Sequence, residues 1–352
     1  MCTGWARKTT SDPGRASAAG GSFPAPARKT GHRGARPEES AVTEAARAAA
    51  ADPAGSRIDG SVALDHGVPH GQPVLDDLVA LLDLERIEEN IFRGVSPAES
   101  PVRVFGGQVA GQALVAAGRT VPEDRSVHSL HAYFIRPGDP SIPIVYEVDR
   151  TRDGRSFTTR RVVAVQRGKA IFSLSASFQV EEDGIDHQEP MPEVPDPETL
   201  PTYGELAGEM LRKLGRAQPR PIDVRYVTDP PWERRGSDNR EARSQVWMKA
   251  DGSLPDDPLL HVCMVAFASD LTLLDAVLGR HGVYWGFDDV SGASLDHAMW
   301  FHRRFRADEW LLYDCASPSA SGARGLATGR FFSRDGRLVA TVVQEGLLRV
   351  NQ

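Results

Sequence analysis

Apolar positions along the chain follow a helical period in three stretches. Residues 74–87 carry leucine and isoleucine at helical spacing, which predicts a first helix. Residues 105–120 predict a second helix, rich in Gly and Ala, whose small side chains would let another element pack closely against it. Residues 258–282 are almost continuously apolar and predict a third helix.

After the second and third helices the pattern changes to the period of a strand. Residues 170–180 are the clearest case, because large apolar side chains alternate there with serine and glutamine, as in a strand with one buried face. The pairs Asp153–Gly154 and Asp335–Gly336 are typical of hairpin turns between such strands. Further strands are predicted at residues 127–139, 142–150, 157–166, 244–252, 294–305, 309–322, 325–333 and 337–350.

This order of a helix followed by several strands occurs twice. YFIRP at 133–137 parallels WFHRR at 300–304, and SFQ at 177–179 parallels VVQ at 342–344, both offset by about 165 residues. We interpret the pattern as a divergent tandem duplication. Because the strands are consecutive and joined by hairpins, the expected fold is α+β: two helix-wrapped antiparallel sheets packed as an intramolecular pair, with a ligand cleft at their junction.

Two segments lack this periodicity. Residues 1–72 are rich in Ala, Gly, Ser, Pro and Arg, which predicts a disordered N-terminal extension; its basic first half superficially resembles an organelle transit peptide but shows no amphipathic helix. Residues 184–222 contain seven prolines and predict a linker. The two repeats are therefore expected at 73–183 and 223–352, with the candidate carboxylate in the second.

Composition and charge narrow the class of protein. The 352 residues have a net charge of -7, which gives no general attraction to nucleic acid or to an anionic membrane. The three cysteines, Cys2, Cys263 and Cys315, are odd in number and far apart, so we expect reduced thiols and a cytoplasmic protein. No apolar run reaches the roughly 18 residues of a membrane span, no secretory signal is evident, and the final residues RVNQ are not a peroxisomal address.

Several common catalytic signatures are missing from the chain. The nearest approach to a GxSxG motif, at 292–296, ends in Asp, and neither GxxxxGK[ST] nor HExxH occurs. His128 with His131, and His297 with His302, have odd separations on predicted strands and would face opposite sides of a sheet. We therefore expect neither a metal nor a cofactor.

Three polar residues stand out in apolar surroundings. Asp270 lies inside the run HVCMVAFASDLTLL, where a charge must be paired or used, although a helix-capping aspartate explains it equally well. Ser294 alone would more often be a turn hydroxyl, and Gln344 alone an edge residue. Only the convergence of the three side chains would make a catalytic site.

The residues between about 74 and 350 resemble the acyl-CoA thioesterase II family, which has a double-hotdog fold. The resemblance rests on long motifs, among them LLDLERIEENIFRGVSP, VFGGQVAGQAL, ASDLTLLDAVL, SLDHAMWFHRRF and DGRLVATVVQEGLLR. It implies hydrolysis of acyl-CoA to CoA and free acid, without metal or covalent acyl-enzyme, by an Asp, a Thr or Ser and a Gln that hold the attacking water. The matching positions are Asp270, Ser294 and Gln344; Ser replaces the Thr of many relatives, which would loosen the hydroxyl's position.

Two further expectations concern the glycine-rich helix, which we infer from the chemistry of helix N-termini, and local cations. The backbone N–H groups of Gly107 and Gln108 are candidates for stabilising an oxyanion, and we expect Gln108 to stand where Asp270 stands in the other repeat. Coenzyme A phosphates would need arginines on an acidic protein. The candidates are Arg136, Arg160, Arg161, Arg303, Arg304, Arg306 and Arg324.

The function expected from the sequence is therefore an acyl-CoA thioesterase acting on medium- to long-chain fatty acyl-CoA. One alternative is another hotdog enzyme, a hydratase or dehydratase, which would need a His acting with an acid such as Asp296. A second alternative is a non-catalytic acyl-CoA-binding module. We also expect a homo-oligomer, since hotdog sheets often associate.

Overall fold

Antiparallel strands form one continuous sheet in this computed structural model, which describes residues 62–97, 103–213, 215, 218–285 and 290–350. Its order is β3-β4-β6-β7-β8-β5-β12-β15-β14-β13-β10-β9, and β11 pairs with β15 beside this path. The first repeat contributes β3 (Glu85–Glu88), β4 (Ile91–Gly94), β5 (Arg125–Phe134), β6 (Ile144–Asp153), β7 (Phe157–Gln166) and β8 (Lys169–Val180). The second contributes β9 (Ile222–Tyr226), β10 (Arg243–Ala250), β11 (Val290–Ser294), β12 (Asp296–Phe301), β13 (Leu311–Ser321), β14 (Arg324–Ser333) and β15 (Leu338–Val350).

The two repeats have the same strand order when each is followed from its outer edge to the centre of the sheet. They are joined at the centre, where β5 pairs with β12. Just beyond these strands, the Ile135 N–H donates to the Ile171 carbonyl in the first repeat, and the His302 N–H donates to the Val339 carbonyl in the second. Ile171 and Val339 are also the extra residues at matching bulges of β8 and β15. The expected α+β fold with two paired, helix-wrapped antiparallel sheets is confirmed, and the sheets are joined edge to edge.

The bulges correct our alignment of the two repeats. Since Ile171 and Val339 occupy the same place, the residues five positions further on, Ala176 and Gln344, also correspond. The match of SFQ with VVQ instead placed Gln179 opposite Gln344, which is wrong by three residues. An odd shift also places Gln179 on the opposite face of the strand from Gln344, and indeed Ala176 and Gln344 are buried whereas Gln179 is half-buried.

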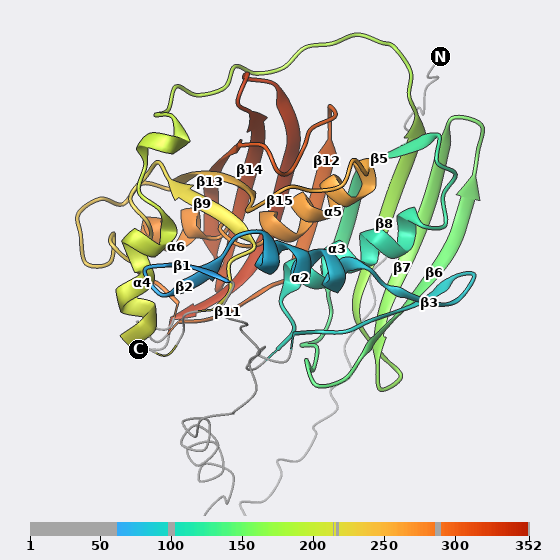
Figure 1. The fold of residues 1–352 in the computed structure, drawn as a ribbon, viewed down its shortest axis with the longest axis horizontal. Coiled ribbons are helices and arrows are strands. Elements are labelled where there is room, and N and C mark those ends of the chain that lie inside the picture. The colour runs from blue at the N-terminus through green and yellow to red at the C-terminus, as the bar shows by residue number, and fades with distance from the viewer. Residues whose placement is uncertain (1–61, 98–102, 214, 216–217, 286–289, 351–352) are drawn as a thin grey trace, which may run out of the picture. The chain divides into compact units, whose positions relative to one another are not determined.

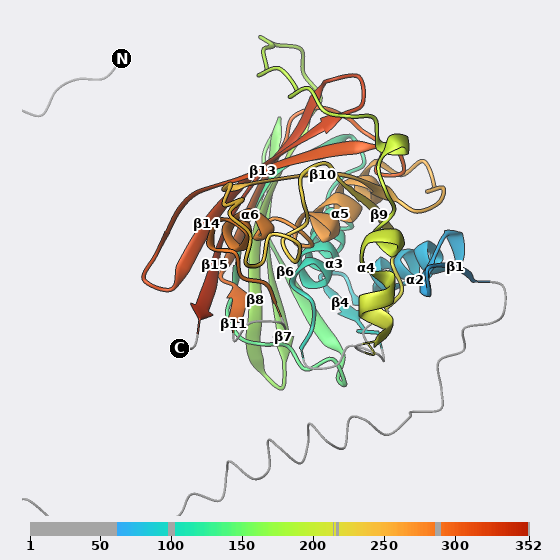
Figure 2. The same ribbon diagram turned by 90° about the vertical axis from the view of Figure 1, so that its left-hand side faces the viewer.

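Helices α3 (Gly106–Gly118) and α5 (Pro258–Ser269) lie on one face of the sheet and pack against each other (Figures 1 and 2). The packing is close, because a Cβ on Gly111 would stand 3.2 Å from the Cys263 carbonyl oxygen. Nearly the whole of α3 is buried, as its run of small side chains predicts. Among the described residues, no helix combines the length and apolarity needed to cross a membrane.

The predicted boundary of the N-terminal extension at residue 72 is wrong by about ten residues. The strands β1 (Ala63–Asp65) and β2 (Val68–His70) form a hairpin, and α2 (Gln72–Leu82) follows directly. The Gly71 N–H donates to the Asp251 carboxylate at 2.6 Å. Local sequence did not reveal this order because the partner is 180 residues away. The rest of the predicted extension lies outside the described residues.

The predicted linker at 184–222 also contains regular structure. It holds the short 3-10 helix η1 (Pro197–Thr199) and helix α4 (Tyr203–Lys213), and β9 begins at its end. The Thr202 N–H donates to the Glu205 carboxylate at 2.7 Å, and the Glu205 N–H donates to the Thr202 hydroxyl at 3.0 Å. This capping box starts α4 and is visible in the sequence as T-x-x-E, so a local helix signal is present among the prolines.

Two of the predicted helices are shorter than expected. The first ends at Leu82, because the residues after it form β3. The stretch 258–282 breaks after Ser269 and resumes as α6 (Asp275–His281). The break contains Asp270.

Candidate functional site

Asp270 occupies the C-terminal end of α5, where its backbone has ordinary right-handed angles. It is not the N-cap of either neighbouring helix. The N-cap of α5 is Asp257, whose side chain accepts hydrogen bonds from the Leu259 and Leu260 N–H groups, and the N-cap of α6 is Leu274. The Asp270 carboxylate reaches instead to α3 of the other repeat. The alternative interpretation of Asp270 as a simple N-cap aspartate of its own repeat is therefore wrong.

Three donors from three elements converge on the Asp270 carboxylate. The Gly107 N–H of α3 donates to Oδ2 at 3.0 Å. The Ser294 hydroxyl, at the end of β11, and the Gln344 Nε2, in β15, donate to Oδ1 at 3.0 Å and 2.9 Å. Gln344 Nε2 also lies 2.7 Å from Ser294 Oγ. The structure thus brings together the three side chains that the sequence singled out.

Glycines at the start of α3 make this approach possible. A Cβ on Gly106 would stand 2.6 Å from Asp270 Oδ2, and a Cβ on Gly107 would overlap the Phe267 carbonyl oxygen. No other residue leaves room for a carboxylate and a helix backbone this close together. The helix N-terminus in turn favours a negative charge, since its first N–H groups lack partners within the helix.

The two oxyanion candidates have different surroundings. The Gly107 N–H already donates to Asp270, so it orients the carboxylate. Gln108 is the third residue of α3, and its N–H belongs to the first turn, which has no acceptor within the helix. Its buried side chain donates to Val95 and Ser96. Gln108 therefore does not match Asp270 in the duplication, because it begins α3 whereas Asp270 follows the end of α5.

One polar residue of the site was missed in the sequence. His297 in β12 is fully buried, and its Nδ1 lies 2.6 Å from Gln344 Oε1 while its Nε2 lies 2.9 Å from Ser269 Oγ. Burial lowers the pKa of His297, which favours the neutral imidazole. The available indication is a histidine on a predicted strand, which the sequence alone suggests as a metal ligand or an acid-base group rather than as a partner of Gln344.

The pairing of a histidine with Asp296, which a hydratase would need, does not form at His297. Both ring nitrogens of His297 have other partners, and Asp296 Oδ1 accepts the Glu345 N–H at 2.7 Å. Within the described ranges, no group of three or more His, Cys, Asp or Glu side chains is arranged to hold a metal. The chemistry available at the site is that of a carboxylate, a hydroxyl and an amide.

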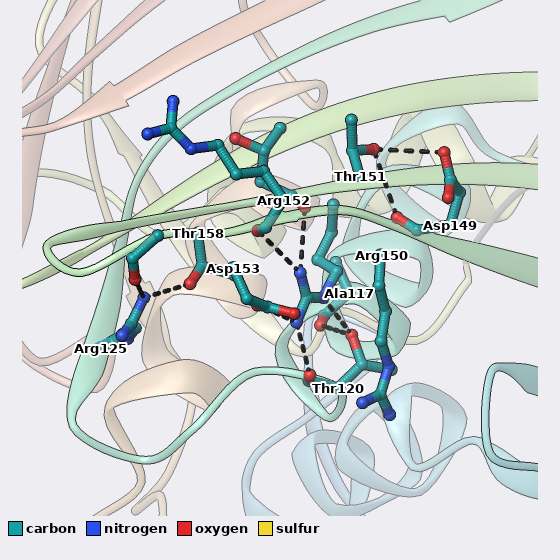
Figure 3. Close-up of polar contacts among 12 residues, drawn as sticks. Ala117, Thr120, Arg125, Asp149, Arg150, Thr151, Arg152, Asp153 and Thr158 are labelled. Carbon is teal, nitrogen blue, oxygen red and sulfur yellow. Dashed lines mark hydrogen bonds and ion pairs between the residues drawn. The ribbon is translucent and has the colours of Figure 1, made fainter.

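Of the arginines proposed for the CoA phosphates, Arg160 is unsuitable. Its guanidinium is buried and donates to the Thr120 hydroxyl, the Thr120 carbonyl and Asp153. It also donates to the Arg152 carbonyl, and Figure 3 labels the partners Thr120, Arg152 and Asp153. This arginine joins the end of α3 to β6 and β7. Other candidates have partners nearby: Arg303 donates to Asp186, Arg304 to Glu181, Arg306 to Asp308 and Asp256, and Arg324 to Glu345.

Comparisons with known proteins agree on one family. The model described as acyl-CoA thioesterase matches residues 219–347, and the one described as acyl-CoA thioesterase N-terminal domain matches residues 96–179. The chain is 42% identical over 306 residues to acyl-coenzyme A thioesterase 8 of Homo sapiens, which covers 83% of this chain and 95% of that protein. It is 39% identical to acyl-CoA thioesterase 2 of Haemophilus influenzae, covering 79% of this chain and 99% of that one.

Solved structures give the same result for the fold. Acyl-CoA thioesterase II TesB2 from Mycobacterium marinum matches with a TM-score of 0.65 and 46% sequence identity, over 78% of this chain and 98% of that one. A conserved protein of unknown function with a hot dog fold, from Alicyclobacillus acidocaldarius, matches with a TM-score of 0.63 at 22% identity, over 78% of this chain and 99% of that one. The expected double-hotdog architecture is confirmed.

Proposed function

The chain belongs to the acyl-CoA thioesterase family and is an acyl-CoA hydrolase, and on this premise we propose that Asp270, Ser294 and Gln344 hold the attacking water. The observation that carries the proposal is the number of donors on the Asp270 carboxylate. A carboxylate offers about four positions to hydrogen-bond donors. Ser294, Gln344 and the Gly107 N–H use three, which leaves room for a proton of one water molecule.

Each member of the site has a role in this scheme. Asp270 accepts one proton of the water while the water oxygen attacks the thioester carbonyl carbon. The Ser294 hydroxyl and the Gln344 amide hold the carboxylate by donating to it, and the Ser294 oxygen can also accept a hydrogen bond from the water. The C–S bond then breaks, and the CoA sulfur takes the proton from Asp270, giving free acid and CoA. A thioester is already activated, so a positioned water suffices.

Stabilisation of the oxyanion comes from the start of α3 in this proposal. The Gln108 N–H follows the Gly107 N–H that holds Asp270, and it belongs to the same first turn of α3, where N–H groups have no acceptor within the helix. A carbonyl carbon near Asp270 would therefore have its oxygen close to a backbone donor and to the positive end of the helix dipole.

An apolar cavity supports a fatty acyl substrate of medium or longer chain. The cavity has a volume of about 220 Å³ and includes Val277, Val290 and Leu348 in its lining. Val290 precedes Ser294 by four residues on β11, and Leu348 follows Gln344 by four residues on β15. Four residues of strand span about 13 Å, so a tail would have to extend that far beyond the thioester to reach the cavity.

The test is the release of free thiol from a panel of acyl-CoAs of increasing chain length. Wild type should hydrolyse medium- and long-chain substrates, and Asp270→Asn should lower kcat by about 10³-fold, because a general base contributes roughly that factor. Circular dichroism should be unchanged in the variant. Tight acyl-CoA binding without turnover of any substrate would favour the binding module, and full activity in Asp270→Asn would reject the proposed mechanism.

A cytoplasmic location and a homo-oligomeric state remain part of this proposal. Cys263 and Cys315 are free and buried, which suits a reducing compartment. Tyr133 and Ile135, at the end of the central strand β5, are 66% and 44% exposed, which supports a contact between subunits. Light scattering of the purified protein would determine the oligomeric state, and fluorescence microscopy of the tagged full chain its location.

A further inference from the structure

We propose that His297 is a positioning residue that holds the Gln344 side-chain amide in the one orientation that supports Asp270. The proposal rests on the function proposed above, because it assigns His297 a part in the same site. Its basis is a set of buried hydrogen bonds in which each donor can be assigned.

The assignment starts at the Asp270 carboxylate. An ionised carboxylate only accepts hydrogen bonds, so the Gln344 group 2.9 Å from Asp270 Oδ1 must be the NH2 group. The amide oxygen of Gln344 therefore faces His297 Nδ1 at 2.6 Å. Since an amide oxygen only accepts, Nδ1 of His297 must carry a proton.

The other ring nitrogen of His297 completes the assignment. Burial favours the neutral ring, as described above, and a neutral imidazole has a single N–H. Nε2 therefore accepts from the Ser269 hydroxyl, which lies 2.9 Å away. The Ser269 hydroxyl can also donate to the Ala266 carbonyl at 3.0 Å, but it has a single hydrogen, so our assignment requires that this hydrogen go to Nε2.

These bonds close a ring of interactions. Asp270 accepts from Gln344, Gln344 accepts from His297, His297 accepts from Ser269, and Ser269 is covalently bonded to Asp270. Rotating the amide of Gln344 by half a turn would place its oxygen against the carboxylate and its NH2 against the protonated Nδ1. Both contacts would be repulsive, so this closed set of hydrogen bonds selects one orientation of the Gln344 amide.

The chemistry of the amide excludes a proton relay. A neutral side-chain amide does not pass a proton between its oxygen and nitrogen at ordinary pH, so Gln344 separates the imidazole from Asp270. The other acidic group near the ring, Asp296, accepts the Glu345 N–H. His297 thus acts through orientation and leaves the transfer of protons to Asp270.

The first repeat supplies a natural comparison for variants. His302 and Ile135 correspond in the two repeats, so His297 corresponds to Leu130, five residues earlier on the matching strand. Leu130 is fully buried and well packed there. A His297→Leu chain should therefore fold, while losing the donor to Gln344.

The kinetic experiment compares three variants of the full chain with wild type, using thiol release from the preferred acyl-CoA. His297→Leu should lower kcat on the order of 100-fold with little change in KM, as expected when a reacting group is misplaced by about 1 Å. His297→Asn keeps an N–H near the place of Nδ1 and should recover most of the loss. His297→Gln places its amide near the position of Nε2 and should not.

A second measurement does not depend on activity. Long-range 1H–15N NMR of the imidazole should show a proton on Nδ1 and a lone pair on Nε2 of His297. Failure of wild type to hydrolyse any acyl-CoA would reject the proposed function and leave this measurement to decide the hydrogen-bond assignment. A proton on Nε2 alone, or a kcat of His297→Leu within about threefold of wild type, would overturn the positioning role.

Discussion

The two ends of the packed helix pair α3 and α5 are equivalent in the fold and different in chemistry. At one end α5 begins, and its first N–H groups are capped by Asp257 of the same helix. At the other end α3 begins after Phe105, whose side chain cannot accept a hydrogen bond. The Gly107 N–H there donates to Asp270, which the opposite repeat supplies.

The residues that follow each helix differ in the same sense. Arg119 follows α3 and donates to the Leu84 carbonyl and to Asp83, and Thr120 beside it is held by Arg160. Asp270 follows α5 and faces the site. At the junction where α3 ends and α5 begins, the backbone groups find partners nearby. At the junction where α5 ends and α3 begins, the N-terminus of α3 is open to the Asp270 carboxylate. In the proposed mechanism, only the junction that contains Asp270 takes part in catalysis.

The largest expected contrast is between glutamines of the two repeats. Gln344→Ala should lower kcat by roughly 10²–10³-fold, because an amide that touches Asp270 and Ser294 is removed. Gln179→Ala changes the residue that the sequence motifs had equated with Gln344, and we expect no more than a twofold effect. Equal losses in steady-state assays of both variants would restore the motif alignment and refute the alignment by bulges.

Helix α6 distinguishes the second repeat further, because six residues join α3 directly to β5 in the first. Its first residue, Asp275, is buried and accepts from the Tyr226 hydroxyl at 3.1 Å; burial raises the pKa of Asp275 to about 7, while Arg234 and Arg220 partly oppose the shift. Because the pKa of Asp275 is higher in the folded state than in the unfolded state, its protonated carboxyl stabilises the fold at a pH below the unfolded-state pKa of about 4. This stabilisation is lost as the pH rises through the folded-state pKa of about 7.

Asp275→Asn should remove that loss. Relative to wild type, its free energy of unfolding should increase by roughly 3 kcal/mol between pH 5 and pH 8, since about two pKa units lie between pH 5 and the folded value. Urea denaturation at both pH values measures the difference. Parallel stability curves for the two proteins would show that Asp275 ionises freely in the folded state.

Glycines at the two ends of α3 provide a matched pair of substitutions. Gly107→Ala should lower the free energy of unfolding by about 2 kcal/mol and reduce activity as well, because the added methyl group overlaps the Phe267 backbone oxygen. In Gly118→Ala the methyl group meets only the Leu259 side chain, at 2.5 Å, which can rotate. Thermal unfolding should therefore separate the two variants, and an equal loss would contradict the asymmetry of the junctions.

The smallest expected effect concerns the start of α5, where Asp257 caps the helix within its own repeat. Asp257→Ala removes the cap of α5 and should cost about 1 kcal/mol of stability. Because Asp257 is remote from the site chemistry, kcat should stay within twofold of wild type. A large fall in kcat with unchanged stability would mean that both junctions take part in catalysis.

Elements with a strong local pattern could be predicted closely. The strand predicted at 157–166 is β7 (Phe157–Gln166), and the helix predicted at 105–120 is α3 (Gly106–Gly118). The short strands β3, β4 and β9 were missed, since four or five residues carry little periodic information. The hairpin before α2 was missed because Asp251 holds it from the second repeat.

The residues of the candidate site likewise fall into those that the sequence indicates and one that it does not. Asp270 was recognisable as a charge in an apolar run, and the family resemblance pointed to Ser294 and Gln344. His297 was not recognised, because its role depends on Gln344 and Ser269, which are 47 and 28 residues away. Hydrogen bonds between side chains this far apart follow from strand register, which local patterns do not encode.

By itself, the sequence determined the duplicated helix and strand pattern, the family and the residue types that can activate water, because these depend on composition, period and motif. Only the tertiary structure decided that a carboxylate at the end of α5 meets the start of α3, and that His297 Nδ1 lies against the Gln344 amide oxygen. The physical reason is that a buried polar group is stable only with its partners in place, and the packing of the two repeats supplies them.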